Sequence, residues 1–259
     1  MQEPVRIEKH DALWEITLDR PKANAIDTAT SLALASAFIA FRDAPSARVA
    51  ILTGAGRFFS AGWDLKDAAE SETADDYGPG GFAGLTELFD LEKPVIAAIN
   101  GLTVGGGFEM ALACDLLIAA EGVEFFLPEA GIGVIPDAGG ILRLPRRLPR
   151  AIAMEMMLTG KRLTAANARH YGLLNEVVAP AELMPAARRL AERVLAAAPL
   201  AAAAIKASVA ATEALTVEAG FALLRRGGVP AYQRLRQSDD YFEGARAFAE
   251  KRKPVWRGR

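Results

Sequence analysis

The sequence predicts an α/β fold, because short apolar strands alternate with helical stretches along a chain of 259 residues. The segment 13–19, LWEITLD, alternates apolar and polar residues with the period of a half-buried strand. Two later segments, VAILT at 49–53 and PVIAAI at 94–99, are continuously apolar, which is typical of strands buried on both faces. A glycine closes each of them, at Gly54 and at Gly101, where turns are expected.

Helical segments are expected between and after these strands. Asp27 is placed to cap a helix whose Leu34, Phe38 and Phe41 fall on one face. LLIA at 116–119 indicates a further buried strand. Strands and helices therefore follow one another along the chain, as an α/β fold requires.

The character of the chain changes near position 199. From 195 onward alanine-rich helical segments replace the alternating strands. We therefore expect residues 1–198 to form an α/β core with the active site, and residues 199–259 to form an α-helical oligomerisation region. Within the core, the segment 67–81 is acidic up to Tyr77 and then rich in glycine, so we expect a mobile surface loop there.

Composition excludes several classes of function. The formal net charge is −2 and no cluster of lysine and arginine dominates a segment, which argues against nucleic-acid binding. The chain has one cysteine, Cys114, so no intrachain disulfide is possible. The N-terminal segment lacks the apolar core of a signal peptide, and the longest apolar run, 194–205, is short and interrupted by Pro199. We expect a cytoplasmic protein without a membrane span.

Two glutamates in apolar surroundings are the candidate catalytic groups. The chain has no phosphate-binding loop, nucleotide-binding glycine motif or zinc-binding pattern, and it has two histidines only. Glu109 follows the cluster Gly105-Gly106-Gly107 at the start of a predicted helix, where backbone N–H groups and the helix dipole face a ligand. Glu129 lies in FFLPEAG, and burial raises the pKa of a carboxyl group, as proton transfer near neutral pH requires. Either glutamate, taken singly, is also what an ordinary helix start prefers.

A second motif, RFFSAGWDLK at 57–66, follows the strand that ends at Gly54. The carboxyl end of a strand is the usual ligand side of an α/β sheet. Together with NGLTVGGGFE and PEAGIGVIPDAGG, this motif resembles the crotonase superfamily. LDRPKANAID near the start and AFAEKRKP near the end are also similar to that family, so the resemblance covers nearly the whole chain.

The resemblance implies a crotonase-like (ClpP/crotonase) spiral of ββα units with a C-terminal helical trimerisation region, assembled as a homotrimer or as a hexamer of two trimers. It implies an oxyanion hole made by the backbone N–H groups of Trp63 and Gly106, with Glu109 and Glu129 as the catalytic acid and base. It also implies a set of positions that contact CoA or the substrate: Lys22, Ala23, Asn24, Ala25, Ala61, Gly62, Asp64, Leu65 and Gly105. Two further positions, Phe248 and Lys251, are implied to reach the CoA nucleotide bound to a neighbouring subunit.

The implied activity is reversible hydration and dehydration of an acyl-CoA thioester, that is, a hydro-lyase. Longer stretches such as FFSAGWDLK and GPGGFAGLTE are similar to a branch of the family whose members dehydrate carnitinyl-CoA to crotonobetainyl-CoA. CoA is then part of the substrate, and neither a metal nor a cofactor is expected. A generic short-chain enoyl-CoA hydratase, an isomerase using one glutamate and a silent CoA-binding scaffold remain alternatives. Trp63 is expected either to face a trimethylammonium group or simply to close the pocket.

Overall fold

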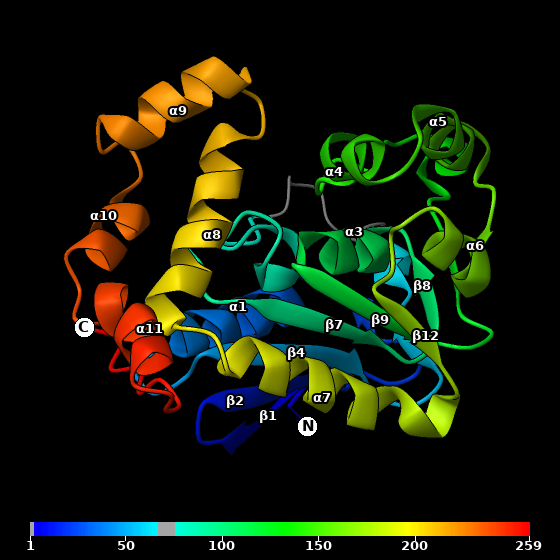
Figure 1. Cartoon of the computed structure of the whole chain (residues 1–259). Coiled ribbons are helices and arrows are strands. Elements are labelled where there is room, and N and C mark those ends of the chain that lie inside the picture. The colour runs from blue at the N-terminus through cyan, green and yellow to red at the C-terminus, as the bar shows by residue number, and fades with distance from the viewer. Residues whose placement is uncertain (1–2, 67–75) are drawn as a thin grey trace. The chain divides into compact units, whose positions relative to one another are not determined.

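A computed structural model describes residues 3–66 and 76–259 of the chain (Figure 1). The chain folds into two compact units. The first contains the residues through Leu91 together with Val95–Ala191, and the second contains Glu92–Pro94 and Glu192–Arg259. Of the loop predicted over 67–81, the part at 67–75 lies outside the described residues, including Glu70, Glu72 and Asp75.

A six-stranded sheet with the order β1-β2-β4-β7-β9-β12 forms the centre of the first unit. All neighbouring pairs are parallel except β1 and β2. The continuously apolar runs of the sequence form the middle strands, which are buried along their length, as a parallel sheet covered on both faces requires. The bounds are β1 (Val5–His10), β2 (Leu13–Leu18), β4 (Val49–Gly54), β7 (Val95–Ile99), β9 (Leu116–Ala120) and β12 (Glu176–Val178).

A second sheet of short strands has the order β11-β10-β8-β5. Three times in succession, a strand of the large sheet is followed along the chain by a strand of this small sheet: β4 by β5, β7 by β8, and β9 by β10. This repeat of paired strands is the predicted spiral of ββα units. The short strands are β3 (Ala25–Ile26), β5 (Phe58–Ser60), β6 (Gly62–Trp63), β8 (Leu102–Val104), β10 (Glu124–Phe126) and β11 (Leu163–Thr164), with β3 and β6 pairing separately.

The helices of the first unit begin largely where the sequence predicts. Asp27 caps α1 (Thr28–Asp43) by accepting a 2.7 Å hydrogen bond from the backbone N–H of Thr30, and Leu34, Phe38 and Phe41 on that helix are buried. The helix α3 packs against η1 and the short strands β5, β6 and β8. The remaining helices and 3₁₀ turns are η1 (Phe82–Gly84), α3 (Gly106–Ala113), η2 (Glu129–Ile132), α4 (Gly140–Arg147), α5 (Arg150–Thr159), α6 (Ala165–His170), η3 (Pro180–Glu182) and α7 (Leu183–Leu195), of which the last residues, from Glu192, belong to the second unit.

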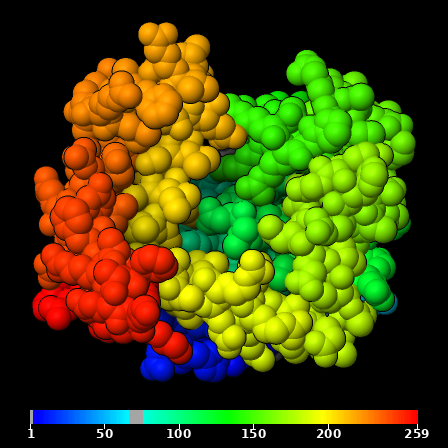
Figure 2. All heavy atoms as spheres, in the orientation of Figure 1, coloured from blue at the N-terminus to red at the C-terminus, as the bar shows by residue number. Residues whose placement is uncertain are grey.

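The second unit is helical and exposes many apolar side chains. Its helices are α8 (Pro199–Thr212), α9 (Val217–Arg225), α10 (Pro230–Arg236) and α11 (Asp240–Ala249), drawn yellow to red in Figure 2. Ile205, Val217 and Phe248 are among its exposed apolar residues, and Phe248 is 88% exposed. Asp240 holds the C-terminal segment by accepting from the backbone N–H groups of Arg257 and Gly258. The predicted division at 198/199 falls inside this unit, at the start of α8, and stays a prediction.

No single helix within residues 3–66 and 76–259 is long and apolar enough to cross a membrane. One bent pair, Pro180–Leu195 with Pro199–Thr212, has the necessary length and composition only when its two helices are taken together.

Candidate active site

A cavity of about 430 Å³ opens in the first unit, where β6, α3, η1 and η2 meet. Both predicted glutamates and both predicted oxyanion donors line it. Its lining among the described residues is Ala61, Trp63, Leu65, Tyr77, Phe82, Glu87, Val104, Gly105, Gly106, Glu109, Pro128, Glu129, Ile132, Val134, Ile135, Asp137 and Ala138.

Glu109 lies in the first turn of α3 and is only 3% exposed. Its Oε1 accepts a 2.7 Å hydrogen bond from the backbone N–H of Gly140, the first residue of α4. Burial raises the pKa of Glu109 to about 8, because the charged carboxylate is poorly solvated; the Gly140 hydrogen bond opposes this, and the negative charges of Glu129 and Asp137 add to it. A carboxyl group with this pKa is mostly protonated at neutral pH.

Glu129 follows Pro128 at the start of η2 and is 8% exposed. A side chain on Gly105 would meet the Oε1 of Glu129, since a Cβ built there lies 2.7 Å from it. The other oxygen, Oε2, is buried and has no hydrogen-bond partner among the described residues. Burial raises the pKa of Glu129 above its ordinary value; its own backbone N–H opposes this and the charge of Asp137 adds to it. Glu129 therefore presents a poorly solvated acceptor in the cavity.

The two predicted oxyanion motifs meet through glycine. Gly62, immediately before Trp63, has φ +79°, and a Cβ there would lie 2.6 Å from the Val104 carbonyl oxygen and 2.8 Å from the Gly106 nitrogen. Only glycine therefore allows β6 to contact the start of α3 this closely. Gly106 is the first residue of α3, so its N–H has no acceptor within the helix and lies at the positive end of the helix dipole.

Aromatic and acidic side chains, without any basic one, line the described part of the cavity. The aromatic residues are Trp63, Tyr77 and Phe82, and the ring centroids of the last two lie 5.3 Å apart, edge to face. The indole Nε1 of Trp63 is buried and has no acceptor among residues 3–66 and 76–259. The acidic residues are Glu87, Glu109, Glu129 and Asp137. A neutral or positively charged acyl group suits this cavity better than an anionic one.

The model of the enoyl-CoA hydratase/isomerase family matches residues 8–259 of the chain. The chain belongs to this family. The predicted family and fold class are thus confirmed, and with them the assignment to enzymes of the hydratase type.

Relatives and solved structures agree with the family assignment. The chain is 55% identical to carnitinyl-CoA dehydratase from Salmonella typhi and from Salmonella agona, with all of each chain covered. The crystal structure of enoyl-CoA hydratase from Mycobacterium tuberculosis H37Rv has a TM-score of 0.91 at 41% identity, covering all of both chains. Enoyl-CoA hydratase from Bacillus anthracis has a TM-score of 0.88 at 33% identity, covering 99% of this chain and 100% of that one.

Some of the CoA-binding positions implied by the family resemblance line the cavity, and others lie in the turn before β3 or in β3 itself. Ala61, Leu65 and Gly105 line the cavity. Lys22 is exposed and lies with Ala23 in the turn before β3, the partner of β6, and Ala25 is in β3 itself. Their roles as ligand contacts stay predictions.

Asn24 and Asp64 have side chains engaged within the fold of this family member. The Nδ2 of Asn24 donates to the carbonyl oxygens of Ala55 and Phe58, at 3.0 and 2.9 Å. Asp64 accepts a 2.7 Å hydrogen bond from Arg20, which also pairs with Asp27 at 2.8 Å. Sequence reasoning missed Arg20, although a lone arginine among nearby acids in the motif LDRPKANAID was a signal for an ion pair.

Phe248 and Lys251 lie in the second unit. Phe248 is on α11 and Lys251 follows that helix in an exposed turn, at φ +52°. Their predicted contact with CoA of a neighbouring subunit stays a prediction.

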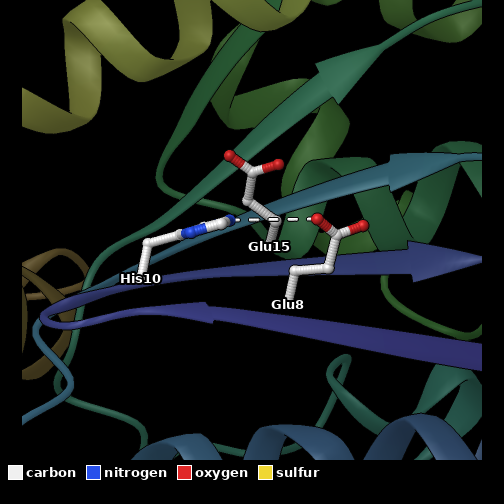
Figure 3. A group of neighbouring side chains, drawn as sticks. All are labelled: Glu8, His10 and Glu15. Atoms are coloured by element: carbon white, nitrogen blue, oxygen red, sulfur yellow. Dashed lines mark ion pairs between the residues drawn. The ribbon is translucent and has the colours of Figure 1, made fainter.

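One cluster with the geometry of a metal site occurs among the described residues, formed by Glu8, His10 and Glu15 on β1 and β2 (Figure 3). His10 Nε2 lies 3.9 Å from Glu8 Oε2. Glu15 accepts two hydrogen bonds from Arg188, at 2.7 and 2.8 Å, so its charge is already balanced. None of the three lines the cavity.

Proposed function

We propose that this chain is a hydro-lyase that reversibly dehydrates carnitinyl-CoA to crotonobetainyl-CoA. Full-length identity of 55% to proteins named carnitinyl-CoA dehydratase supports the substrate. The observation that carries the proposal is the cavity itself, which combines two buried carboxyl groups of raised pKa with three aromatic rings, and which has no basic side chain in its described lining.

Trp63 and Gly106 donate their backbone N–H groups to the thioester oxygen. Removing the α-proton, or adding water at the β-carbon, develops negative charge on that oxygen. Preorganised donors stabilise such charge because they need not reorient during the reaction, an effect of about 3–4 kcal/mol for each donor. The contact between Gly62 and the Gly106 nitrogen supports this pairing, because it brings the two motifs side by side.

Glu129 and Glu109 divide the proton transfers between them. In the dehydration direction Glu129 removes the α-proton, and protonated Glu109 gives its proton to the departing β-hydroxyl group. The pKa of about 8 at Glu109 supports the acid role, since the group holds its proton at neutral pH. Hydration reverses both roles, and Glu109 then orients the attacking water.

The substrate is selected by charge and by aromatic faces. A trimethylammonium group has no N–H to donate, so carboxylates and ring faces are what recognise it. A desolvated cation–π contact contributes about 2 kcal/mol, which corresponds to roughly thirtyfold discrimination. Trp63, Tyr77 and Phe82 supply the rings.

The assembly we propose is a homotrimer or a hexamer of two trimers in the cytoplasm, with residues 1–198 as the core and 199–259 as the oligomerisation region. The exposed apolar side chains of the second unit support this assembly. CoA enters as part of the substrate, and the chemistry requires no metal or redox cofactor. Its proposed contacts are Lys22, Ala23, Asn24, Ala25, Ala61, Gly62, Asp64, Leu65 and Gly105, with Phe248 and Lys251 reaching a neighbouring subunit's CoA.

A turnover screen tests the substrate. We expect a higher kcat/KM for crotonobetainyl-CoA than for crotonyl-CoA or longer enoyl-CoA esters. The opposite order would favour a generic short-chain enoyl-CoA hydratase, the activity in the names of the solved relatives. No turnover of any ester would favour a silent CoA-binding scaffold.

Glutamine variants test the two carboxyl groups. Glu109→Gln and Glu129→Gln should each lower kcat by orders of magnitude and change KM little, because each carboxyl moves a proton in the reaction. Glu155→Gln is the matched control, since Glu155 is exposed on α5 and pairs with Lys161, which follows that helix. If Glu129→Gln alone were inactive while Glu109→Gln stayed active, a one-glutamate isomerase would be the better assignment.

A further inference from the structure

Asp137 has the least engaged carboxylate in the cavity. It lies in the loop between η2 and α4, where its backbone N–H donates to the Ile135 carbonyl oxygen at 2.8 Å. Its side chain lines the cavity and has neither a hydrogen bond nor an ion pair within residues 3–66 and 76–259. A lone carboxylate in a cavity without basic side chains is free to attract a cationic ligand.

The charge of Asp137 reaches both glutamates that carry the proposed chemistry, because it raises the pKa of Glu109 and the pKa of Glu129. Asp137 also lines the same cavity as both glutamates. The buried Oε2 of Glu129, without a partner in the described chain, is an independent sign that this part of the cavity takes a ligand.

Glu87, another carboxylate that lines the cavity, lies near a cation of the protein. The guanidinium of Arg143 on α4 donates to the Thr86 carbonyl oxygen at 2.6 Å, and it interacts with the charges of Glu87 and Glu109. The positive charge of Arg143 therefore partly balances the charge of Glu87, and Glu87 attracts a cationic ligand less strongly.

The chemistry of the substrate places a cation in this region. In a carnitinyl or crotonobetainyl group the quaternary nitrogen is two bonds from the β-carbon. If the α- and β-carbons lie between Glu109 and Glu129, the nitrogen must lie within a few ångströms of both. A carboxylate that binds this nitrogen must likewise lie near both glutamates. It cannot be one of the two glutamates, because a permanent contact with a cation would lower the pKa that proton transfer requires.

We infer that Asp137 is a specificity-determining residue, whose carboxylate attracts the trimethylammonium group of the substrate while the rings of the cavity enclose that group. This inference rests on the proposed function. Asp137 is exposed, and an exposed pair of unlike charges contributes up to about 1 kcal/mol, which corresponds to about fivefold discrimination.

An uncharged substrate of the same shape separates charge from size. Crotonobetainyl-CoA is compared with 5,5-dimethylhex-2-enoyl-CoA, in which carbon replaces the quaternary nitrogen. The wild type should prefer the charged ester. Asp137→Asn should lower the ratio of the two kcat/KM values up to about fivefold, mostly through KM for the charged ester. Any change in kcat that follows from the altered pKa values of Glu109 and Glu129 should be the same for both esters.

Glu87→Gln is the matched control, because it removes an equal charge from the same cavity. It should change the ratio less than Asp137→Asn does. An unchanged ratio in Asp137→Asn, or an equal fall in both variants, overturns the role of Asp137 and leaves the proposed function in place. A wild type that does not distinguish the two esters overturns the carnitine substrate itself, and the inference with it.

Discussion

Glu109 on α3 and Gly140 at the start of α4 are joined by a 2.7 Å hydrogen bond from the glycine N–H to the glutamate Oε1. A Cβ on Gly140 would lie 3.0 Å from the same oxygen, so the glycine permits the close approach. This contact fixes the direction of the carboxyl group, and burial raises its pKa to about 8. A protonated carboxyl group is thereby held in one orientation at neutral pH, at a cost to the stability of the fold.

The pH dependence of stability measures this cost. The pKa of Glu109 is about 8 in the folded chain against 4.5 for the ordinary group, so between these values the native state holds a proton that the unfolded state releases. Stability therefore falls as pH rises through that window, and the loss from this one group is about 3 kcal/mol at pH 7. Glu109→Gln removes it, because a neutral amide replaces the titrating carboxyl while its oxygen still accepts from Gly140.

Urea unfolding of the wild type and Glu109→Gln at pH 5 and pH 8 checks this prediction. The variant should gain free energy of unfolding over the wild type at pH 8 and gain much less at pH 5. The same difference at both pH values would show that Glu109 titrates normally in the folded chain.

A glycine pair with similar backbone conformations tests the contact between the oxyanion motifs. Gly62 and Gly56 have φ values of +79° and +73°, but a Cβ on Gly62 meets backbone atoms at 2.6 and 2.8 Å, whereas a Cβ on Gly56 meets nothing within 4 Å. Both alanine variants should lose about 1 kcal/mol of stability from the positive φ. Only Gly62→Ala should also lower kcat, by at least tenfold, because it displaces Gly106. Equal kcat values in the two folded variants would separate this contact from catalysis.

Much of this arrangement was predictable from local sequence. The apolar runs at 49–53 and 94–99 indicated the buried strands β4 and β7, since a strand inside a parallel sheet has no polar face. Glu109 was recognisable because three glycines precede it, and glycines before a helix are a local signal for a ligand. The family resemblance then supplied the roles that residue chemistry alone left open.

The remaining features depend on contacts between distant parts of the chain. Gly140 and Asp137 contribute to the site because the loop before α4 returns to α3, and no pattern within that loop encodes the return. Asn24 and Asp64 show the converse. The family resemblance placed both among the CoA contacts, which stays a prediction, but the sequence did not show that their side chains bond to Phe58 and Arg20 inside the fold. Sequence locates polar residues near a site but does not say which neighbour takes their hydrogen bonds.

A lysine variant tests the proposed contact between Lys251 and CoA. Lys251→Ala should raise KM for CoA esters several-fold and leave KM for pantetheine-truncated analogues unchanged, because a lysine at the nucleotide end pairs with phosphate groups. Lys253→Ala is the matched control, since Lys253 is also exposed and lies two residues further along. Equal increases for both classes of substrate, or for both variants, would remove Lys251 from the CoA site.

Trp63 offers two separable interactions, a ring face and an indole N–H that is buried without an acceptor in the described chain. Trp63→Phe keeps an aromatic face and the backbone N–H, and it loses no hydrogen bond of the described fold. Trp63→Ala keeps the backbone N–H alone. If the ring face selects the cation, the preference for crotonobetainyl-CoA over crotonyl-CoA should fall up to about thirtyfold in Trp63→Ala and only slightly in Trp63→Phe.

Steady-state kinetics of both variants with both esters distinguish the two interactions of Trp63. Turnover of crotonyl-CoA should change less than the preference does, since the oxyanion donor is a backbone group that both variants retain. A loss of kcat for both esters in Trp63→Phe would show instead that the indole N–H donates to the reacting part of the substrate. An unchanged preference in Trp63→Ala would mean that the ring only closes the pocket, and cation selection would then depend on the carboxylates of the cavity.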